Sequence, residues 1–447
     1  ILIRQGQLAE AKANIEKALA QNPTLFPAKF NLAATESRLG NVDTSNQLIE
    51  ELLELSPQHN ETLMLKAFNL TKAGNVDEAK QIYLDILTLN PSNIGARERV
   101  SSLYQQQGDT KNALYHLDLL IKDDFDNADY LLRKAALQLG NNQRADAEKT
   151  LSIARNFIND DAGKLIAYAD QARSIGNDED ALDAMARAYE IANSSTFVTL
   201  RYTSLLLDLQ NNDKAQSLLT SIPKDQQQNP VYHFLKGRLE ANKGKNDRAI
   251  AAFEKALDVD STFAQAFIAI YNYALNEQFV DVFLNTARKL IAENENNLLA
   301  KNLLAQYLFF IQEFDESIAL YKALIEEPNL LNPAEAYNRL AIMHIETSLV
   351  TAKNYARQAY ELQPNSAKIL DTYGHIKALQ GDYEGSLKML RDAFARDAND
   401  PNIRYHLGYT LAKLNRIEEA KKELEYAVNV ERPFFRRPQA RALLESL

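Results

Sequence analysis

Hydrophobic positions along this chain recur in a pattern that repeats every 34 residues. Within each repeat, large apolar side chains follow one another at intervals of four and three residues, which places them on one stripe of an α-helix. Two apolar stretches occur in each repeat, and a short polar stretch separates them. The pattern predicts an all-α array in which pairs of helices stack side by side.

Small residues form a column in the second helix of each pair, and nine of its 13 positions hold alanine. A small side chain there lets a neighbouring helix approach closely, because nothing larger separates the two backbones. The column predicts 13 second helices, with members at Ala11, Ser45, Ala79, Ala113, Ala147, Ala181, Ala215, Ala249, Phe283, Ser317, Ala352, Ser386 and Ala420. A similar column in the first helices runs from Ala33 to Gly408, and Tyr271 interrupts it.

Half of the 14 glycines occupy a turn column between the two helices of a pair. Glycine readily adopts the left-handed conformation that ends a helix, and asparagine does so next best. Proline follows several second helices, where it prevents the helix from continuing. The turn column contains Gly6, Gly40, Gly74, Gly108, Asn142, Gly176, Gln210, Gly244, Gln278, Gln312, Gly381 and Asn415.

These columns, their order and the 34-residue period resemble the tetratricopeptide repeat over essentially the whole chain. The resemblance implies a right-handed α-α superhelix of about 13 helical hairpins followed by a C-terminal capping helix. Irregular stretches at residues 221–230 (SIPKDQQQNP) and 328–333 (PNLLNP) suggest subdivisions. We therefore expect a truncated first repeat at 1–25, an N-terminal array at 26–230, a central array at 231–332, a C-terminal array at 333–432 and the capping helix at 433–447.

The amino-acid composition limits the kinds of partner that we expect the chain to bind. The chain has 50 basic and 60 acidic side chains and a formal charge of −10, which argues against binding to nucleic acid. It contains no cysteine, so disulfides and thiolate chemistry are excluded. No apolar run approaches the ~18 residues needed to span a bilayer, and we expect no direct membrane insertion. Because residue 1 falls inside a helical pattern, we expect a fragment whose targeting segment lies upstream.

Catalytic and metal-binding patterns are missing from the sequence. Its six histidines form no ligand motif, and the last three (His344, His375 and His406) stand 31 residues apart, so we expect them to drift around the helix faces and not all to converge. The sequence predicts no enzyme, no cofactor and no metal site. An arginine cluster beside Phe434 and Phe435 is interpreted either as a site for an acidic partner or, preferably, as a solvated cap whose phenylalanines pack inward. It comprises Arg432, Arg436, Arg437 and Arg441.

In such an array the first helices line a concave groove. The predicted inward positions carry amide and aromatic side chains, and an amide can both donate to and accept from an extended peptide backbone. The alternative is that these amides only keep the groove soluble. The predicted partner-binding set is Asn272, Asn276, Asn302, Gln306, Asn338, Asp371, His375, Tyr405 and Tyr409. The expected partner is a protein or extended peptide, and self-association is compatible with the pattern.

Residues 369–428 are similar to the ending of a bacterial group, the PEP-CTERM system tetratricopeptide lipoproteins. The DTYG element (Asp371 to Gly374) and the RYHLGYTLAKL element (Arg404 to Leu414) carry most of this similarity. The resemblance implies a scaffold in the cell envelope, periplasmic or anchored to the outer membrane, that organises exopolysaccharide production or protein sorting and export. The alternatives are a cytoplasmic adaptor or co-chaperone module of the same fold, and repeats that regulate an enzyme domain outside this chain.

Overall fold

A computed structural model describes the chain except for residues 1, 4, 194, 432 and 433. The described residues form 26 α-helices and one short 3₁₀ helix, and none of them lies in a β-strand. The chain divides into two compact units, Ile1–Ile222 and Pro223–Leu447. The division falls inside the SIPKDQQQNP stretch, and the finer division of the second unit at residue 332 stays a prediction.

Unit 1 comprises α1 (Leu8–Gln21), α2 (Phe26–Leu39), α3 (Val42–Leu55), α4 (Asn60–Lys72), α5 (Val76–Leu89), α6 (Ile94–Gln106), α7 (Thr110–Asp123), α8 (Ala128–Gly140), α9 (Arg144–Ala154), α10 (Ala162–Ser174), α11 (Asp178–Ile191), α12 (Thr196–Asp208) and α13 (Asn212–Ser221). Unit 2 begins with the 3₁₀ helix Lys224–Gln226. It continues with α14 (Pro230–Asn242), α15 (Asn246–Val259), α16 (Ala264–Leu275), α17 (Val280–Glu293), α18 (Leu298–Phe310), α19 (Phe314–Ile325), α20 (Pro333–Met343), α21 (Leu349–Leu362), α22 (Ala367–Leu379), α23 (Tyr383–Arg396), α24 (Pro401–Lys413), α25 (Ile417–Asn429) and α26 (Arg437–Glu445).

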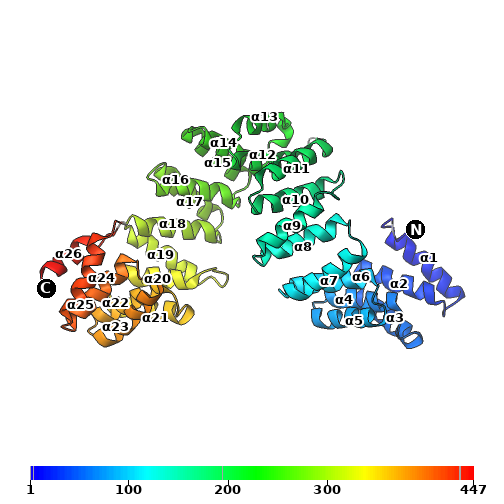
Figure 1. Cartoon of the computed structure of the whole chain (residues 1–447), viewed down its shortest axis with the longest axis horizontal. Helices are drawn as coiled ribbons and strands as arrows, with labels where there is room; N and C mark the ends of the chain where they lie inside the picture. The colour runs from blue at the N-terminus through cyan, green and yellow to red at the C-terminus, as the bar shows by residue number, and fades with distance from the viewer. Residues whose placement is uncertain (1, 4, 194, 432–433) are drawn as a thin grey trace. The chain divides into compact units, whose positions relative to one another are not determined.

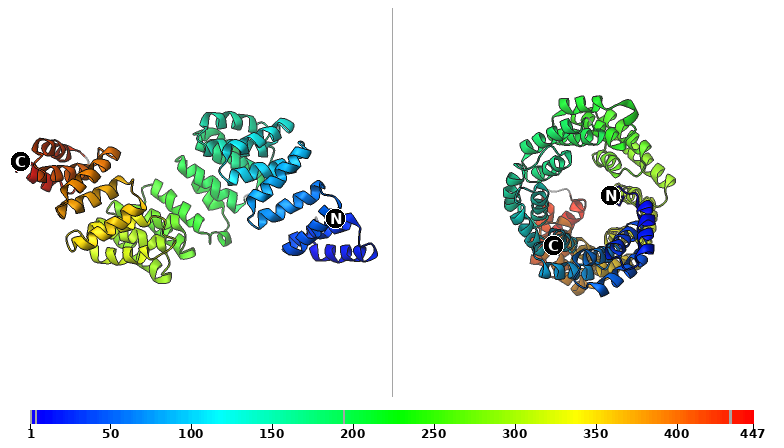
Figure 2. Two further views of the ribbon diagram at one scale, coloured as in Figure 1. Left: turned by 90° about the horizontal axis from the view of Figure 1, so that it is seen from below. Right: turned by 90° about the vertical axis from the view of Figure 1, so that its right-hand side faces the viewer.

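From α2 to α24, each even-numbered helix is the first helix of a hairpin and packs against the odd-numbered helix that follows it (Figure 1). Second helices in turn pack against the first helix of the next hairpin, so that consecutive hairpins stack within each unit (Figure 2). The prediction of an all-α, α-α superhelical fold is confirmed, and α26 occupies the stretch predicted to cap the array.

Both small-residue columns lie where two helices meet. No member of the second-helix column is more than 3% exposed, and Ala113 and Ala249 are fully buried, as predicted. At two of the three serines in this column, the hydroxyl bonds to the paired first helix. Ser45 Oγ donates to the Ala33 carbonyl (2.8 Å), and Ser317 Oγ donates to the Ala305 carbonyl (2.9 Å). Because the buried hydroxyl is satisfied, serine is tolerated at a dry position.

The same column also contacts the next hairpin. Ser45 Oγ accepts a hydrogen bond from Asn69 Nδ2 at 3.0 Å, and the hydroxyls of Ser386 and Thr410 lie 3.0 Å apart. Each pair joins a second helix to the following first helix across 24 residues of sequence. One stacking register therefore recurs in repeats of both units.

Left-handed turns end most first helices, as the turn column predicts. Gly40 ends α2 at φ 89°, and Asn142, Gln210, Gln312 and Asn415 adopt the same conformation without glycine. The prediction is wrong at Gln278. There the left-handed residues are Glu277 and Phe279, because α16 stops at Leu275 and the turn begins earlier.

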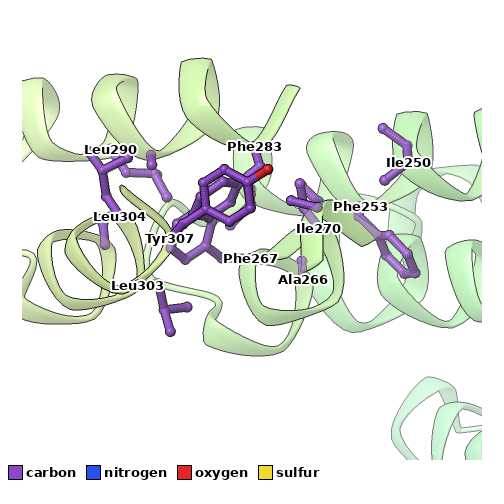
Figure 3. Close-up of a cluster of buried hydrophobic side chains, with 14 of the residues drawn as sticks. Ile250, Phe253, Ala266, Phe267, Ile270, Phe283, Leu290, Leu303, Leu304 and Tyr307 are labelled. Carbon is purple, nitrogen blue, oxygen red and sulfur yellow. The ribbon is translucent and has the colours of Figure 1, made fainter. Parts of the chain in front are cut away.

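The hairpin of α16 and α17 replaces both small residues with aromatic ones. The Phe283 ring is fully buried and lies beside the rings of Phe267 and Tyr307 (Figure 3), with centroids 5.6 and 5.2 Å away. The Tyr271 ring is also 5.2 Å from it. In this hairpin, the aromatic rings fill the space between the two helices. In the other hairpins, small residues let the two backbones approach each other, so this space does not exist. The irregular stretches also have structural counterparts, because α13 ends at Ser221 just before Pro223, and PNLLNP lies in the connection between α19 and α20.

Candidate partner-binding face

The predicted partner-binding residues lie on α16, α18, α20, α22 and α24 of unit 2 or directly at their ends. We call the surface formed by these helices the first-helix face. Side-chain caps define where several of them begin: Asn297 Oδ1 accepts from the Ala300 amide at the start of α18 (3.0 Å), and Asp400 Oδ1 accepts from the Asn402 amide at the start of α24 (2.8 Å). These caps satisfy backbone donors that the helix leaves unpaired.

The amide side chains at the α16 and α18 end of the face remain accessible to solvent. Asn272 and Asn276 are exposed, and Asn276 Nδ2 donates to the Asn272 carbonyl at 2.8 Å. Asn302 and Gln306 are half-buried, and Gln306 Nε2 donates to Asn302 Oδ1 at 3.2 Å. Local bonds therefore orient these amides, while donor and acceptor capacity is left for a partner.

On α20, several buried polar atoms have no hydrogen-bond partner among the described residues. They are Asn338 Oδ1, Arg339 Nε and the Tyr321 hydroxyl contributed by α19. Asn338 is only 3% exposed, and burial raises the pKa of Tyr321. Arg339 is otherwise held by an ion pair with Glu335 (2.7 Å) and lies 4.5 Å from the centre of the Phe309 ring. A buried polar atom without a partner costs about 1–3 kcal/mol, which a ligand group would relieve.

The α22 and α24 end of the face contains a compact polar cluster. His406 Nδ1 lies 2.8 Å from Asp371 Oδ1, and the His375 and His406 rings are stacked with centroids 3.8 Å apart and planes 15° apart. Two of the last three histidines therefore meet, which is compatible with the expectation that all three do not converge. His375 in α22 and His406 in α24 become neighbours because adjacent first helices are staggered. Asp371 lies four residues before His375, on the same side of α22, and therefore also reaches His406.

Burial governs the protonation of this cluster. It lowers the pKa of His406 to about 3 and holds the pKa of His375 well below its usual value of 6.5, so both rings are neutral at pH 7. Burial also raises the pKa of Asp371 well above its usual value of 3.8, and the nearby Asp400 carboxylate adds to this effect. The charged form of each group is disfavoured because little water reaches it.

Part of the predicted set is covered by the chain itself. Asp371, His375 and Tyr405 are buried, Tyr409 is half-buried, and Phe434 packs against Tyr405 with ring centroids 6.1 Å apart. The interpretation of the terminus as a cap with two inward phenylalanines is wrong for Phe435, which is 75% exposed. Arg432 of the arginine cluster lies outside the described residues.

Sequence reasoning missed a cavity in unit 2, which has a volume of about 940 Å³ and lies between the second helices α15 and α17. Exposed polar side chains line most of it, and no periodic pattern distinguishes them from other solvated residues. Over the described ranges, no group of three or more histidine or acidic side chains is placed to hold a metal ion. No helix in the described part of the chain is long and apolar enough to cross a membrane.

Comparison with known families agrees with the helical geometry. One profile described as tetratricopeptide repeat matches residues 2–67 and 377–447, and another with the same description matches residues 89–298. Together they cover most of the chain, which is therefore built from tetratricopeptide repeats. Among curated proteins, it is similar to the TPR repeat-containing protein YpiA of Bacillus subtilis (strain 168), with 23% identity over 293 residues, 64% of this chain and 67% of that protein.

Solved structures of similar fold include the Cut9–Hcn1 hetero-tetramer of the APC/C, with 15% identity, a TM-score of 0.39 and coverage of 99% of this chain and 94% of that one. A tetratricopeptide repeat protein from Parabacteroides merdae has 16% identity, a TM-score of 0.39 and coverage of 53% and 93%. The Naa15/Naa10 complex bound to HypK-THB has 16% identity, a TM-score of 0.32 and coverage of 92% and 69%. These values support no inference about partners.

Proposed function

We propose that this chain is a non-enzymatic scaffold that binds a protein partner, through an extended peptide segment, on the first-helix face of unit 2. The observation that carries the proposal is Asn338, a buried amide in the middle of this face whose Oδ1 has no hydrogen-bond partner. A buried amide of this kind is stabilised when a ligand donates to it. A tetratricopeptide array is suited to protein–protein interaction, and the amide-rich stretch supports this face as the contact within it.

The neighbouring side chains fit the same kind of ligand. Asn302 and Gln306 lie on the preceding first helix, and Arg339 Nε on α20 is a buried donor without a partner. A peptide backbone presents an amide donor and a carbonyl acceptor at every residue other than proline, so it can satisfy an amide acceptor and a guanidinium donor within one short segment. The exposed Phe310 at the end of α18 adds apolar area beside these groups.

Alanine substitution of Asn302 and Asn338 together tests this face. We expect the affinity for a bound peptide to fall by about 5- to 150-fold, because two hydrogen bonds of about 0.5–1.5 kcal/mol each are lost. Peptides selected on the wild-type chain from an unbiased library would be titrated into both proteins, and fluorescence anisotropy would give the two dissociation constants.

The matched control replaces Asn285 and Asn354, which are exposed asparagines on the second helices α17 and α21. This double variant should bind the selected peptides with wild-type affinity. Equal affinity of the Asn302→Ala/Asn338→Ala protein and the wild type would remove the first-helix face as the binding site.

We further propose that the scaffold serves a cell-envelope assembly for exopolysaccharide production or for sorting and export of PEP-CTERM proteins. The similarity of residues 369–428 to the PEP-CTERM system lipoproteins is the support for this role. Fractionation of source cells, combined with metabolic labelling by palmitate, tests it. Recovery in a labelled membrane fraction agrees with the envelope role, whereas recovery only in the cytoplasm favours the adaptor alternative.

A further inference from the structure

The His375–His406 pair joins two consecutive first helices through a dry polar contact. The two side chains are 4% and 6% exposed, and their rings are stacked 3.8 Å apart. His375 Nδ1 and His406 Nε2 are both buried without a hydrogen-bond partner. Two neutral imidazoles can stack in this way, whereas two imidazolium ions at this distance repel each other strongly in a low-dielectric site.

Few charged groups face this pair. From α22 comes Asp371, which is 2.8 Å from His406, and from the start of α24 comes Asp400. Arg436, from the segment before α26, interacts electrostatically with Asp371 and both histidines and bonds to the Tyr405 side chain. The rings of Tyr409 and Tyr405 of α24 lie near His375 and His406, with centroids 6.2 and 5.3 Å away. A positive side chain therefore already lies beside the imidazoles.

That arginine belongs to a segment that packs over the end of the array. We call residues Phe434–Leu447 the C-terminal cover. Phe434 and Ala440 are buried in one cluster with Tyr405 and with apolar residues of α25, and Leu443, Leu444 and Leu447 pack against this cluster. The cover therefore packs against Tyr405, which is next to His406 in α24.

We propose that the His375–His406 pair is an acid-sensitive switch. While both imidazoles are neutral, the C-terminal cover stays packed on the end of the first-helix face, and protonation of the imidazoles releases it. Protonation places up to two new positive charges beside Arg436, with only Asp371 and Asp400 to balance them. The cover is attached through Arg436 and one aromatic contact at this point, so its release separates the like charges without unfolding the hairpins.

The direction of the pH effect follows from burial. In the closed state, the pKa of each histidine is lowered, whereas in the open state it returns towards 6.5. The contribution of the two histidines to the stability of the closed state is therefore complete above pH 6.5, and it is lost as the pH falls below 6.5. Between pH 6.5 and 4.5, the lowered pKa of His406 favours opening by about 50-fold, and the lowered pKa of His375 acts in the same direction.

Asp371 acts in the opposite direction. Its raised pKa means that the closed state holds a proton on this carboxyl more tightly than the open state does, which favours closure as the pH falls. Between pH 6.5 and 4.5, Asp371 shifts the equilibrium towards the closed state by at most about 100-fold. On opening, the two histidines can take up two protons whereas the one carboxyl can release only one, so acidification favours opening.

Hydrogen exchange of α26 measures this opening directly. In the wild-type chain, we expect the protection of the α26 amides, corrected for intrinsic exchange rates, to fall between pH 6.5 and pH 4.5. In His375→Phe, which keeps an aromatic ring in the stack but cannot be protonated, this loss of protection should be smaller or absent, because only one histidine then opposes Asp371. Arg436→Gln, which removes the repelled cation and leaves both histidines in place, should also weaken the pH dependence.

His233→Phe is the matched control, because His233 is another buried histidine of unit 2 with a buried, unpartnered Nε2 and lies far from α26 in sequence. It should leave the pH dependence of α26 unchanged. The same pH dependence in His375→Phe, Arg436→Gln and the wild type would overturn the inference. So would a loss of protection of equal size throughout α15–α19, which would indicate unfolding of the whole unit.

Release of the cover has a consequence for partner binding. Asp371, His375 and Tyr405 belong to the predicted partner-binding set and are buried while the cover is closed. Acidification would then extend the accessible face from α16–α20 to α22 and α24. This consequence rests on the proposed function, whereas the release itself does not, since exchange of α26 is measured without any partner.

Discussion

Replacing Phe283 with alanine lowers the free energy of local opening at α16–α18 by about 3–5 kcal/mol. This result is expected although alanine is the commonest residue at this position of the repeat. Phe283 is fully buried, and its ring contacts those of Phe267, Tyr271 and Tyr307. Removing it leaves a cavity, because the helices on either side are held apart by the remaining rings. Native-state hydrogen exchange of the α16–α18 amides measures the change.

A double-mutant cycle with Tyr271→Ala tests whether the cost of Phe283→Ala comes from the packing of these rings. The alternative is that alanine at position 283 simply restores the usual residue of the repeat at no cost. The two rings lie 5.2 Å apart, so their substitutions should be strongly non-additive. Once Tyr271 is alanine, the helices can approach as they do in the other hairpins, and Phe283→Ala costs less. A neutral or stabilising effect of Phe283→Ala on its own would contradict the packing described for this hairpin.

Replacing Gly237 with valine destabilises α14–α15 by about 3 kcal/mol. A Cβ atom at Gly237 would lie 2.3 Å from Cε1 and 2.5 Å from Cδ1 of Phe253, whose ring is itself buried in the core of unit 2. The ring has no free space to move into, so the helices must separate. Hydrogen exchange of the α14 and α15 amides reports the loss of protection.

Gly140→Val is the matched control, since a Cβ atom at Gly140 meets nothing within 4 Å. Its effect on α8–α9 should stay within about 0.5 kcal/mol. Equal effects of the two valine substitutions would show that the glycine in the first-helix column is not required for close packing.

The repeating core could be predicted from the sequence because each of its rules acts locally and is repeated many times. The buried alanines, the left-handed Gly40 turn and the helix that ends before Pro223 each follow from one side chain and its immediate neighbours. Gln278 departs from the prediction because an early helix end moves the left-handed turn to Glu277, and a column of spacings carries no information about such shifts.

The candidate site was less predictable because it depends on contacts between repeats. The amides of Asn272, Asn302 and Asn338 were placed on one face by the period alone, but the period does not show that Asn338 is buried. The contact between His375 and His406 depends on the stagger of adjacent first helices. No sequence signal indicates that Phe434 covers Tyr405, since the segment that carries it lies outside the repeat pattern.

Cysteine cross-linking tests most directly whether one stacking register runs through the array. The chain has no cysteine of its own, so any disulfide that forms within it must join the two engineered cysteines. One pair replaces Ser45 and Asn69 in unit 1, and the other replaces Ser386 and Thr410 in unit 2; both join side chains whose polar atoms lie 3.0 Å apart. A Ser386→Cys/Tyr409→Cys protein is the control, because Tyr409 contacts His375 on the first-helix face.

Mild oxidation should close a disulfide rapidly in the 45/69 and 386/410 proteins and not in the control. Equivalent positions then contact each other in repeats more than 300 residues apart, as the stacked hairpins require. Free thiols at both engineered pairs after oxidation, or cross-linking of the control alone, would contradict the repeating register on which the fold and the first-helix face depend.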